Sequence, residues 1–69
     1  MRNRVRELRR RRRWTQHLLA KRLGISERDV RALEDADQEP CFKTAIRFAA
    51  LFGKEVDEVF EGYSQKLWS

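Results

Sequence analysis

A chain of 69 residues has room for one domain around one modest core, because a domain of this size buries only about 60% of the surface that its unfolded chain exposes. The single cysteine, Cys41, excludes an internal disulfide, and with only one histidine it excludes a structural zinc site or a Cys-His catalytic pair within one chain. No apolar run approaches the roughly 18 residues of a membrane-spanning helix. We therefore expect a cytoplasmic protein in a reducing compartment.

The net charge of +5 is distributed unevenly along the chain. Residues 1–22 carry ten basic side chains and one acidic one, whereas the remaining 47 residues carry six basic and ten acidic ones. A positive field at one end suits a polyanion lying against one face, because each neutralised phosphate releases counterions. The pattern favours nucleic-acid contact by the cluster Arg9–Arg13, and the alternative is that this cluster is a solvated helix end.

Capping and stop signals predict two helices in the first third of the chain. Asn3 is a candidate N-cap for a helix with Val5 and Leu8 at helical spacing. Thr15 is placed to cap a second helix, which ends at Gly24 because glycine readily adopts the conformation that follows a helix. His17 is expected on the exposed side of this second helix.

The third helix is expected to begin after Ser26, which forms a capping pattern with Asp29 three residues later. Ala20 supplies a small side chain where this helix crosses the second one, and Gly24 allows the positive φ of the turn. The apolar side chains that close over one core are expected to be Leu19, Leu23, Ile25, Val30 and Leu33. The outer face keeps polar residues, and an exposed polar helix start beside a basic patch is what a major groove accepts.

Pro40 ends an acidic loop and precedes a fourth helix over residues 42–52, which Gly53 ends. We expect its core face to consist of Phe42, Ala45, Ile46, Ala49 and Phe52. Leu51 then points almost the opposite way. Trp14, in the loop between the first two helices, is expected to anchor the core.

A short fifth helix is predicted from Val56, Val59 and Phe60. Beyond Gly62, the apolar tail with Tyr63, Leu67 and Trp68 is expected to form a short strand or a partner-binding edge. The predicted fold class is all-α, a five-helix bundle over residues 1–62 followed by a tail over residues 63–69 with a possible dimerisation strand.

The stretch QHLLAKRLGISERDVRAL resembles the helix-turn-helix of the phage repressor and Cro family, also called xenobiotic-response-element-type regulators. The resemblance covers residues 3–60 and includes, in order, RVRELR, WTQHLLAKRLGIS, VRALE, Pro40 and ALFGKEVDEVF. The chain is most similar to the small stand-alone regulators of the cytolysin-repressor type, which act as homodimers. The resemblance implies a lambda-repressor-like bundle that binds double-stranded DNA and regulates transcription as a repressor or an activator. We expect no enzymatic activity, cofactor, metal or small-molecule ligand.

Site residues follow from this resemblance position by position. The base-reading candidates on the third helix are Glu27, Arg28, Arg31 and Ala32. The phosphate-contact candidates are Arg10, Arg12, Gln16, Ser26 and Lys43, of which Gln16 also supports the recognition helix in the family. Arg9 and Glu34 match a pair that forms a salt bridge between the first and third helices of several relatives, the alternative being two independent surface charges.

Two departures from the family bear on this reading. Family members often have glycine where this chain has Arg13 and Ala36. The loop after the third helix carries Glu34, Asp35, Asp37 and Glu39, which should repel phosphate near DNA. The acidic loop supports the alternative function, an antitoxin-like protein-interaction module with weak DNA binding. For Glu27, base reading and a role at the helix start stay equally open.

Assembly is expected to be a homodimer formed through the fourth and fifth helices and the tail. The candidate interface residues are Leu51, Val56, Phe60, Tyr63, Leu67 and Trp68. Such a contact would leave the third helices free to enter successive major grooves about 34 Å apart on an inverted repeat. The alternative is a monomer whose tail folds back over its own core.

Overall fold

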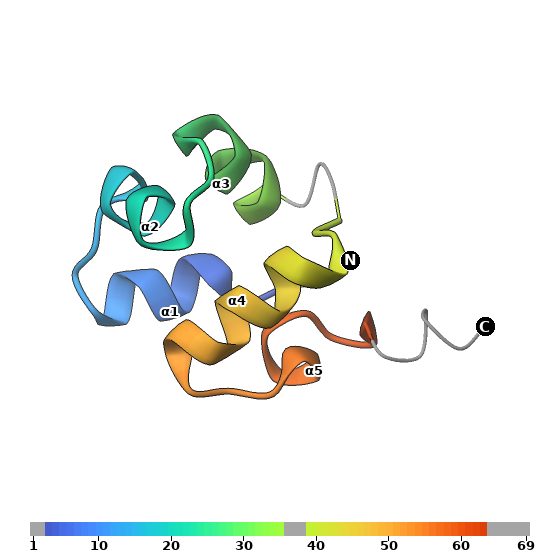
Figure 1. Ribbon diagram of the computed structural model, residues 1–69. Helices are drawn as coiled ribbons and strands as arrows, with labels where there is room; N and C mark the ends of the chain where they lie inside the picture. The colour runs from blue at the N-terminus through green and yellow to red at the C-terminus, as the bar shows by residue number, and fades with distance from the viewer. Residues whose placement is uncertain (1–2, 36–38, 64–69) are drawn as a thin grey trace.

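The structure is a computed structural model that describes residues 3–35 and 39–63. Within these residues the chain forms five helices: α1 (Val5–Arg11), α2 (Gln16–Leu23), α3 (Glu27–Glu34), α4 (Phe42–Phe52) and α5 (Val56–Val59). Helices α2 and α3 lie together at one side of the bundle, and α5 lies beside α4 at the other (Figure 1). The described residues contain no sheet, so the all-α prediction is confirmed.

The predicted signals at the ends of the helices are present. The hydroxyl of Thr15 accepts a hydrogen bond from the Leu18 amide at 3.0 Å, and that of Ser26 accepts one from the Asp29 amide at 3.0 Å. Each bond satisfies a backbone N–H that the first turn of a helix leaves without a partner. Gly24 ends α2 with φ +71°, and Gly53 ends α4 with φ +62°.

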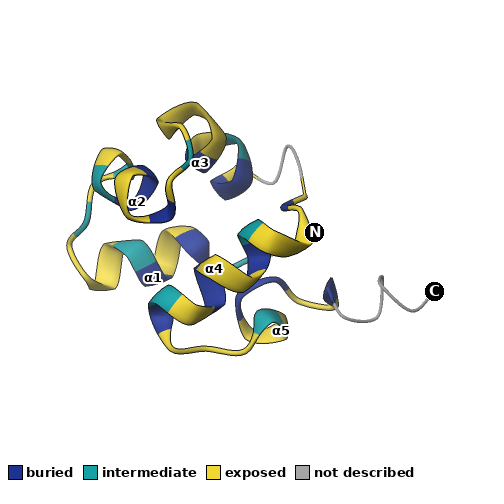
Figure 2. Cartoon of the chain, viewed as in Figure 1, coloured by how far each residue is buried: buried dark blue, intermediate teal, exposed yellow. Residues whose placement is uncertain are grey.

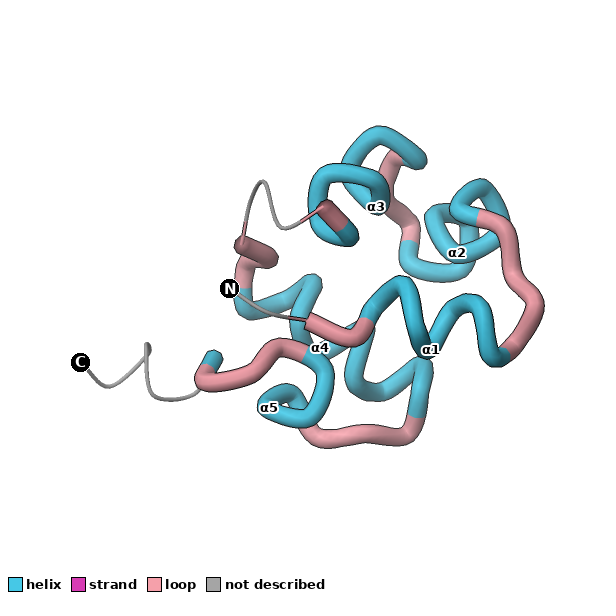
Figure 3. Tube along the Cα trace, turned by 180° about the vertical axis from the view of Figure 1, so that it is seen from behind, coloured by secondary structure: helices cyan, strands magenta, loops and turns pink. Residues whose placement is uncertain are grey.

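The start of α1 lies one residue later than predicted, because Arg4 and not Asn3 is its N-cap residue. Asn3 still accepts a hydrogen bond from the Val5 amide at 3.2 Å, and its side-chain amide donates to the Leu33 carbonyl at 2.8 Å. The Arg4 amide donates to the Val59 carbonyl at 2.8 Å. These hydrogen bonds hold the segment before α1 to both α3 and the end of α5. Figure 3 shows this segment beside the loop that follows α5.

The core lies between the helices, where the buried stretches of α1 to α5 face one another (Figure 2). The predicted residues Leu19, Leu23, Val30 and Leu33 are all buried, and Ile25 packs against them from a partly buried position. Ala20 is also buried where α2 meets α3. A larger side chain at that point would have to push the two helices apart.

The predicted core face of α4 is partly wrong. Phe42 and Ile46 are 53% and 43% exposed, whereas Phe48 is completely buried. The buried side of α4 is formed by Ala45, Phe48, Ala49 and Phe52. Phe48 meets the ring of Phe60 edge to face, with centroids 5.5 Å apart. The contact with Phe60, which follows α5, therefore favours burial of this face of α4 over the face that we predicted.

The end of the described chain also differs from the prediction. Phe60 and Tyr63 are buried, and the Tyr63 hydroxyl donates a hydrogen bond to the Pro40 carbonyl at 2.9 Å. Both side chains complete the core of their own chain and are not available to a second copy, so they are withdrawn as dimer candidates. Leu51 and Val56 are partly buried and pack against the core, which corrects the outward direction predicted for Leu51. Leu67 and Trp68 lie outside the described residues.

The loop between α1 and α2 combines a strained residue with a stacked one. Arg13 has φ +58°, in the left-handed region that a side chain disfavours and glycine accepts. Trp14 packs partly buried against the core, 5.8 Å from the Phe52 ring. The guanidinium groups of Arg12 and Arg22 lie 5.1 Å and 4.8 Å from the centre of its ring.

No helix in residues 3–35 and 39–63 combines the length and the apolar character that crossing a membrane requires.

Candidate nucleic-acid interface

The candidate interface is formed by α2, the turn at Gly24 and α3. The Gly24 and Ile25 amides both donate to the Ala20 carbonyl, which closes the end of α2 and starts the chain toward α3. Arg47 of α4 donates a further hydrogen bond to the Leu23 carbonyl at 3.2 Å. Backbone amides and the Arg47 side chain thus bond the carbonyls at the end of α2. These bonds fix the position of the turn from which α3 begins.

The outer face of α3 carries the predicted base-reading residues. Glu27, Arg28 and Arg31 are exposed, whereas Ala32 is only partly so. Ser26 is exposed, and its oxygen accepts the capping hydrogen bond from Asp29. On the opposite side, Val30 and Leu33 are buried in the core. One face of α3 is therefore anchored, and the other presents charged side chains to the solvent.

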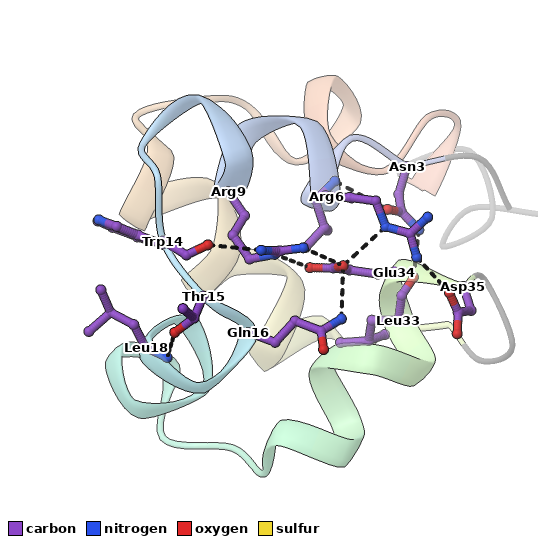
Figure 4. A network of polar contacts seen from close by, with 11 residues as sticks. Asn3, Arg6, Arg9, Trp14, Thr15, Gln16, Leu18, Leu33, Glu34 and Asp35 are labelled. Atoms are coloured by element: carbon purple, nitrogen blue, oxygen red, sulfur yellow. Dashed lines mark hydrogen bonds and ion pairs between the residues drawn. The ribbon is translucent and has the colours of Figure 1, made fainter.

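Glu34, at the end of α3, is the centre of a network that joins three helices (Figure 4). Its side chain is 0% exposed. Arg9 donates to its two oxygens at 2.6 Å and 3.1 Å, Gln16 donates at 3.1 Å, and Arg6 donates at 3.2 Å. The Arg9 side chain, itself 11% exposed, also donates to the Trp14 carbonyl at 2.8 Å. The salt bridge between Arg9 and Glu34 that the resemblance implied is confirmed.

Two opposing effects act on the Glu34 carboxyl. Burial alone would raise its pKa, because a charge is costly to remove from water. The hydrogen bonds from Arg9, Gln16 and Arg6 outweigh burial, so the pKa of Glu34 lies below its ordinary value. The carboxyl is therefore ionised at neutral pH and holds α1 and α2 against the end of α3.

Arg6 and Asp35 belong to the same network and were missed from the sequence. Arg6 donates to Asp35 at 2.6 Å as well as to Glu34. Arg6 and Arg9 are three residues apart, so they lie on the same side of α1. That spacing, set beside the predicted partner Glu34, was a signal for the second arginine. Because Asp35 is paired, part of the negative charge of the acidic loop is neutralised within the chain.

The arginine run divides into residues with and without internal partners. Arg11 pairs with Glu7 at 3.2 Å. Arg12 donates to the Leu51 carbonyl at 3.0 Å and lies 4.8 Å from the centre of the Phe52 ring. Among the described residues Arg10 has no such partner, and its side chain is exposed. It borders an open hollow lined by Arg6, Arg9, Arg10, Thr15, Gln16 and Glu27.

The other phosphate candidates are placed as follows. Gln16 is half-buried at the start of α2, on the same hollow as Arg10, and its amide nitrogen is bonded to Glu34. Lys43 is exposed in the first turn of α4. Glu27, at the start of α3, lies near two side chains: Oε2 is 3.6 Å from Nδ1 of His17, and Oε1 is 4.0 Å from Nη2 of Arg31. Within residues 3–35 and 39–63, no group of three or more His, Cys, Asp or Glu side chains is arranged to hold a metal ion.

Comparison with known proteins agrees with this geometry. Residues 5–59 match the helix-turn-helix family model. Two proteins of Archaeoglobus fulgidus, each named an "uncharacterized HTH-type transcriptional regulator", are 32% and 31% identical over 68 residues, covering 99% of this chain and 96% and 97% of their own lengths. The Bacillus subtilis regulator YgzD, with the same description, is 32% identical over 60 residues, 87% of this chain and 91% of its own.

The match of the family model extends from α1 to α5 and includes every residue of the two helices and the turn described above. The chain therefore belongs to the helix-turn-helix family of Cro and phage-repressor type, whose members are DNA-binding transcriptional regulators.

Proposed function

We propose that this protein is a sequence-specific regulator that binds an inverted repeat as a homodimer, with α3 of each copy in a major groove. The observation that carries the proposal is the exposed charged face of α3 formed by Glu27, Arg28 and Arg31. Arginine reads guanine through two parallel hydrogen bonds, and glutamate accepts from the amino group of cytosine. The Glu34 network supports this proposal, because a helix that reads bases must be held at a fixed position on its domain.

Phosphate contacts are assigned to Arg10, Gln16 and Lys43, with Ser26 at the start of α3. Arg10 and Gln16 line one hollow at the start of α2, next to the recognition face. The backbone N–H groups at this helix start also favour an anion. Arg12, our other candidate in the run, is a weaker one, because its guanidinium already bonds Leu51 and covers two aromatic rings.

Arg10 and Arg12 form a matched pair for testing these contacts. The logarithm of the binding constant falls by about 0.9 per contacted phosphate for each unit of log salt concentration. Arg10→Ala should lower that slope by about one contact per copy, which is about two for the dimer, and weaken binding to all duplexes alike. Arg12→Ala should lower stability and leave the slope close to that of the wild type. Equal slopes for the wild type and Arg10→Ala would remove Arg10 from the interface.

Homodimerisation rests on the resemblance to the stand-alone regulators and on apolar surface. Phe42 and Ile46 are exposed on α4, one helical turn apart, and were not among the predicted interface residues. With Leu51, Val56 and the tail residues Leu67 and Trp68, they are the candidates for contact with a second copy. Sedimentation equilibrium of the wild type at tens of micromolar should give a dimer, and Ile46→Lys should shift it to the monomer. A monomeric wild type would contradict the homodimer.

The function itself is tested by selecting bound duplexes from a random library. The proposal predicts an enriched inverted repeat whose half-sites are one helical turn apart. An antitoxin-like interaction module, the alternative function, would instead enrich no sequence and would bind random duplex weakly. Lys54→Ala is the control variant, because it removes one exposed positive charge between α4 and α5 and leaves α3 unchanged.

A further inference from the structure

We propose that the C-terminal tail, residues 64–69, crosses to the second copy of the homodimer and covers the exposed apolar pair Phe42 and Ile46 at the start of that copy's α4. This inference rests on the proposed homodimer and adds to it the segment and the face that make the contact. Three observations carry it: the apolar surface of α4, the place where the described chain ends, and the area that a stable dimer needs.

The apolar pair forms an exposed face on α4. Phe42 and Ile46 are 53% and 43% exposed, and within residues 3–35 and 39–63 they are the only large apolar side chains that are exposed. They are four residues apart and therefore lie on the same side of the helix. Ala50, one turn further along, is exposed as well. A single exposed apolar residue is ordinary, whereas a contiguous apolar patch marks a site of interaction.

The described chain ends beside the apolar pair. The Tyr63 side chain is buried, and its hydroxyl donates to the carbonyl of Pro40, two residues before Phe42, at 2.9 Å. Figures 1 and 3 both show the end of the described chain on the same side of the molecule as the start of α4. The tail that follows Tyr63 contains Leu67 and Trp68 and spans at most about 20 Å when extended. It therefore begins within reach of the apolar pair, in its own copy or in a second copy held against it.

The area that a dimer needs assigns the tail to the second copy. A stable interface buries about 800 Å² on each partner and is most apolar at its centre. The apolar pair alone is too small for this, and a tail folded over it in the same copy would hide it from a partner. Exchanged tails instead bring Leu67 and Trp68 of each copy onto the apolar pair of the other. One contact then buries the apolar side chains of both segments.

Cys41 permits a direct test, because it is exposed and directly precedes Phe42. Ser69→Cys places a second thiol at the end of the tail. Oxidised with diamide, this variant should give a covalent dimer on a non-reducing gel, and mass spectrometry of its peptides should find residue 41 bonded to residue 69. Adding Cys41→Ser should remove that bond. Adding Lys54→Cys to this double variant moves the thiol from before α4 to after it and should not restore a covalent dimer.

Sedimentation equilibrium gives a second readout on the full chain. Leu67→Ala combined with Trp68→Ala should weaken dimerisation roughly tenfold or more, because both side chains then lose their contact with the apolar pair. Lys66→Ala, a neighbouring change in the tail, is the control and should leave dimerisation close to that of the wild type. Equal dimerisation of the wild type and the double alanine variant would overturn the inference.

The crosslink has two further outcomes that would overturn it. A bond between residues 41 and 69 within a monomer would place the tail on its own copy. A dimeric protein that forms no bond between these two residues would leave the apolar pair to a different partner. Both results keep the proposed homodimer, which fails separately, and the exchange with it, if the wild type sediments as a monomer.

Discussion

The two ends of α3 carry the same kind of residue in opposite environments. Glu34, at the end of the helix, is buried and accepts hydrogen bonds of 2.6–3.2 Å from Arg6, Arg9 and Gln16. Glu27, at the start, is half-exposed and lies 3.6 Å from His17 and 4.0 Å from Arg31. A buried, fully bonded carboxylate fixes the helices, whereas an exposed and loosely held one does not. Burial therefore separates the charges that hold α3 from those available to a ligand.

The largest effect is expected from removing the buried carboxylate. Glu34→Ala leaves the Arg9 guanidinium buried without its partner, and breaking such a pair costs about 3–5 kcal/mol of unfolding free energy. Glu27→Ala, the matched change at the exposed end, should cost less than about 1 kcal/mol. Denaturant unfolding followed by circular dichroism measures both. Similar losses of unfolding free energy for the two variants would show that burial does not determine how much each carboxylate contributes to stability.

The second prediction uses acid instead of mutation. Because the folded-state pKa of Glu34 is lowered, its contribution to stability is fully present above the ordinary glutamate pKa and is lost as the pH falls through the lower folded value. Unfolding free energy should therefore decline below about pH 4.5, and Glu34→Gln should flatten that decline. Melting curves from pH 7 to pH 3 provide the measurement. A variant that declines as steeply as the wild type would assign the acid sensitivity to other carboxyls.

Arg28 and Arg31 test the exposed end of the comparison. Arg28→Ala or Arg31→Ala should cost about 1–3 kcal/mol of binding to the selected duplex and relax the preference at one base pair, while leaving the fold intact. Lys54→Ala is the control for the loss of one charge. Equal losses on selected and random duplex would mean that these arginines contact phosphates and not bases.

The smallest effect concerns the loop before α2. Arg13→Gly should stabilise the fold by up to about 1 kcal/mol, because glycine adopts a φ of +58° without the strain of a side chain. The greater freedom of glycine in the unfolded chain offsets part of this gain. Arg13→Ala is the control, since it removes the same charge and keeps the strain. If the alanine variant gained as much stability as the glycine one, relief of charge repulsion would be the cause.

The starts of α2 and α3 and the ends of α2 and α4 could be predicted because their signals are local. Thr15 and Ser26 bond amides three residues away, and Gly24 and Gly53 end their helices through their own φ. Arg9 and Glu34 are 25 residues apart in the chain, so no local signal predicts their pairing. It was predicted from the resemblance to the family.

Features set by tertiary packing could not be predicted in the same way. The helical spacing of α4 allowed two neighbouring buried faces, and the contact of Phe48 with Phe60 selects the second. Arg10 and Arg12 look alike in the sequence and are both exposed, yet only Arg12 donates to the Leu51 carbonyl of α4. Only the arrangement of α1, α2 and α4 distinguishes a structural arginine from one free to bind phosphate.

We propose that α3, held at one end by Glu34, presents its other end to DNA. Amide chemical-shift mapping of the labelled protein with its selected duplex tests this most directly. We expect the largest shifts at residues 26–31 and at Arg10 and Gln16, with small shifts at residues 56–59 of α5. Large shifts confined to α4 and α5, with residues 26–31 unchanged, would contradict it.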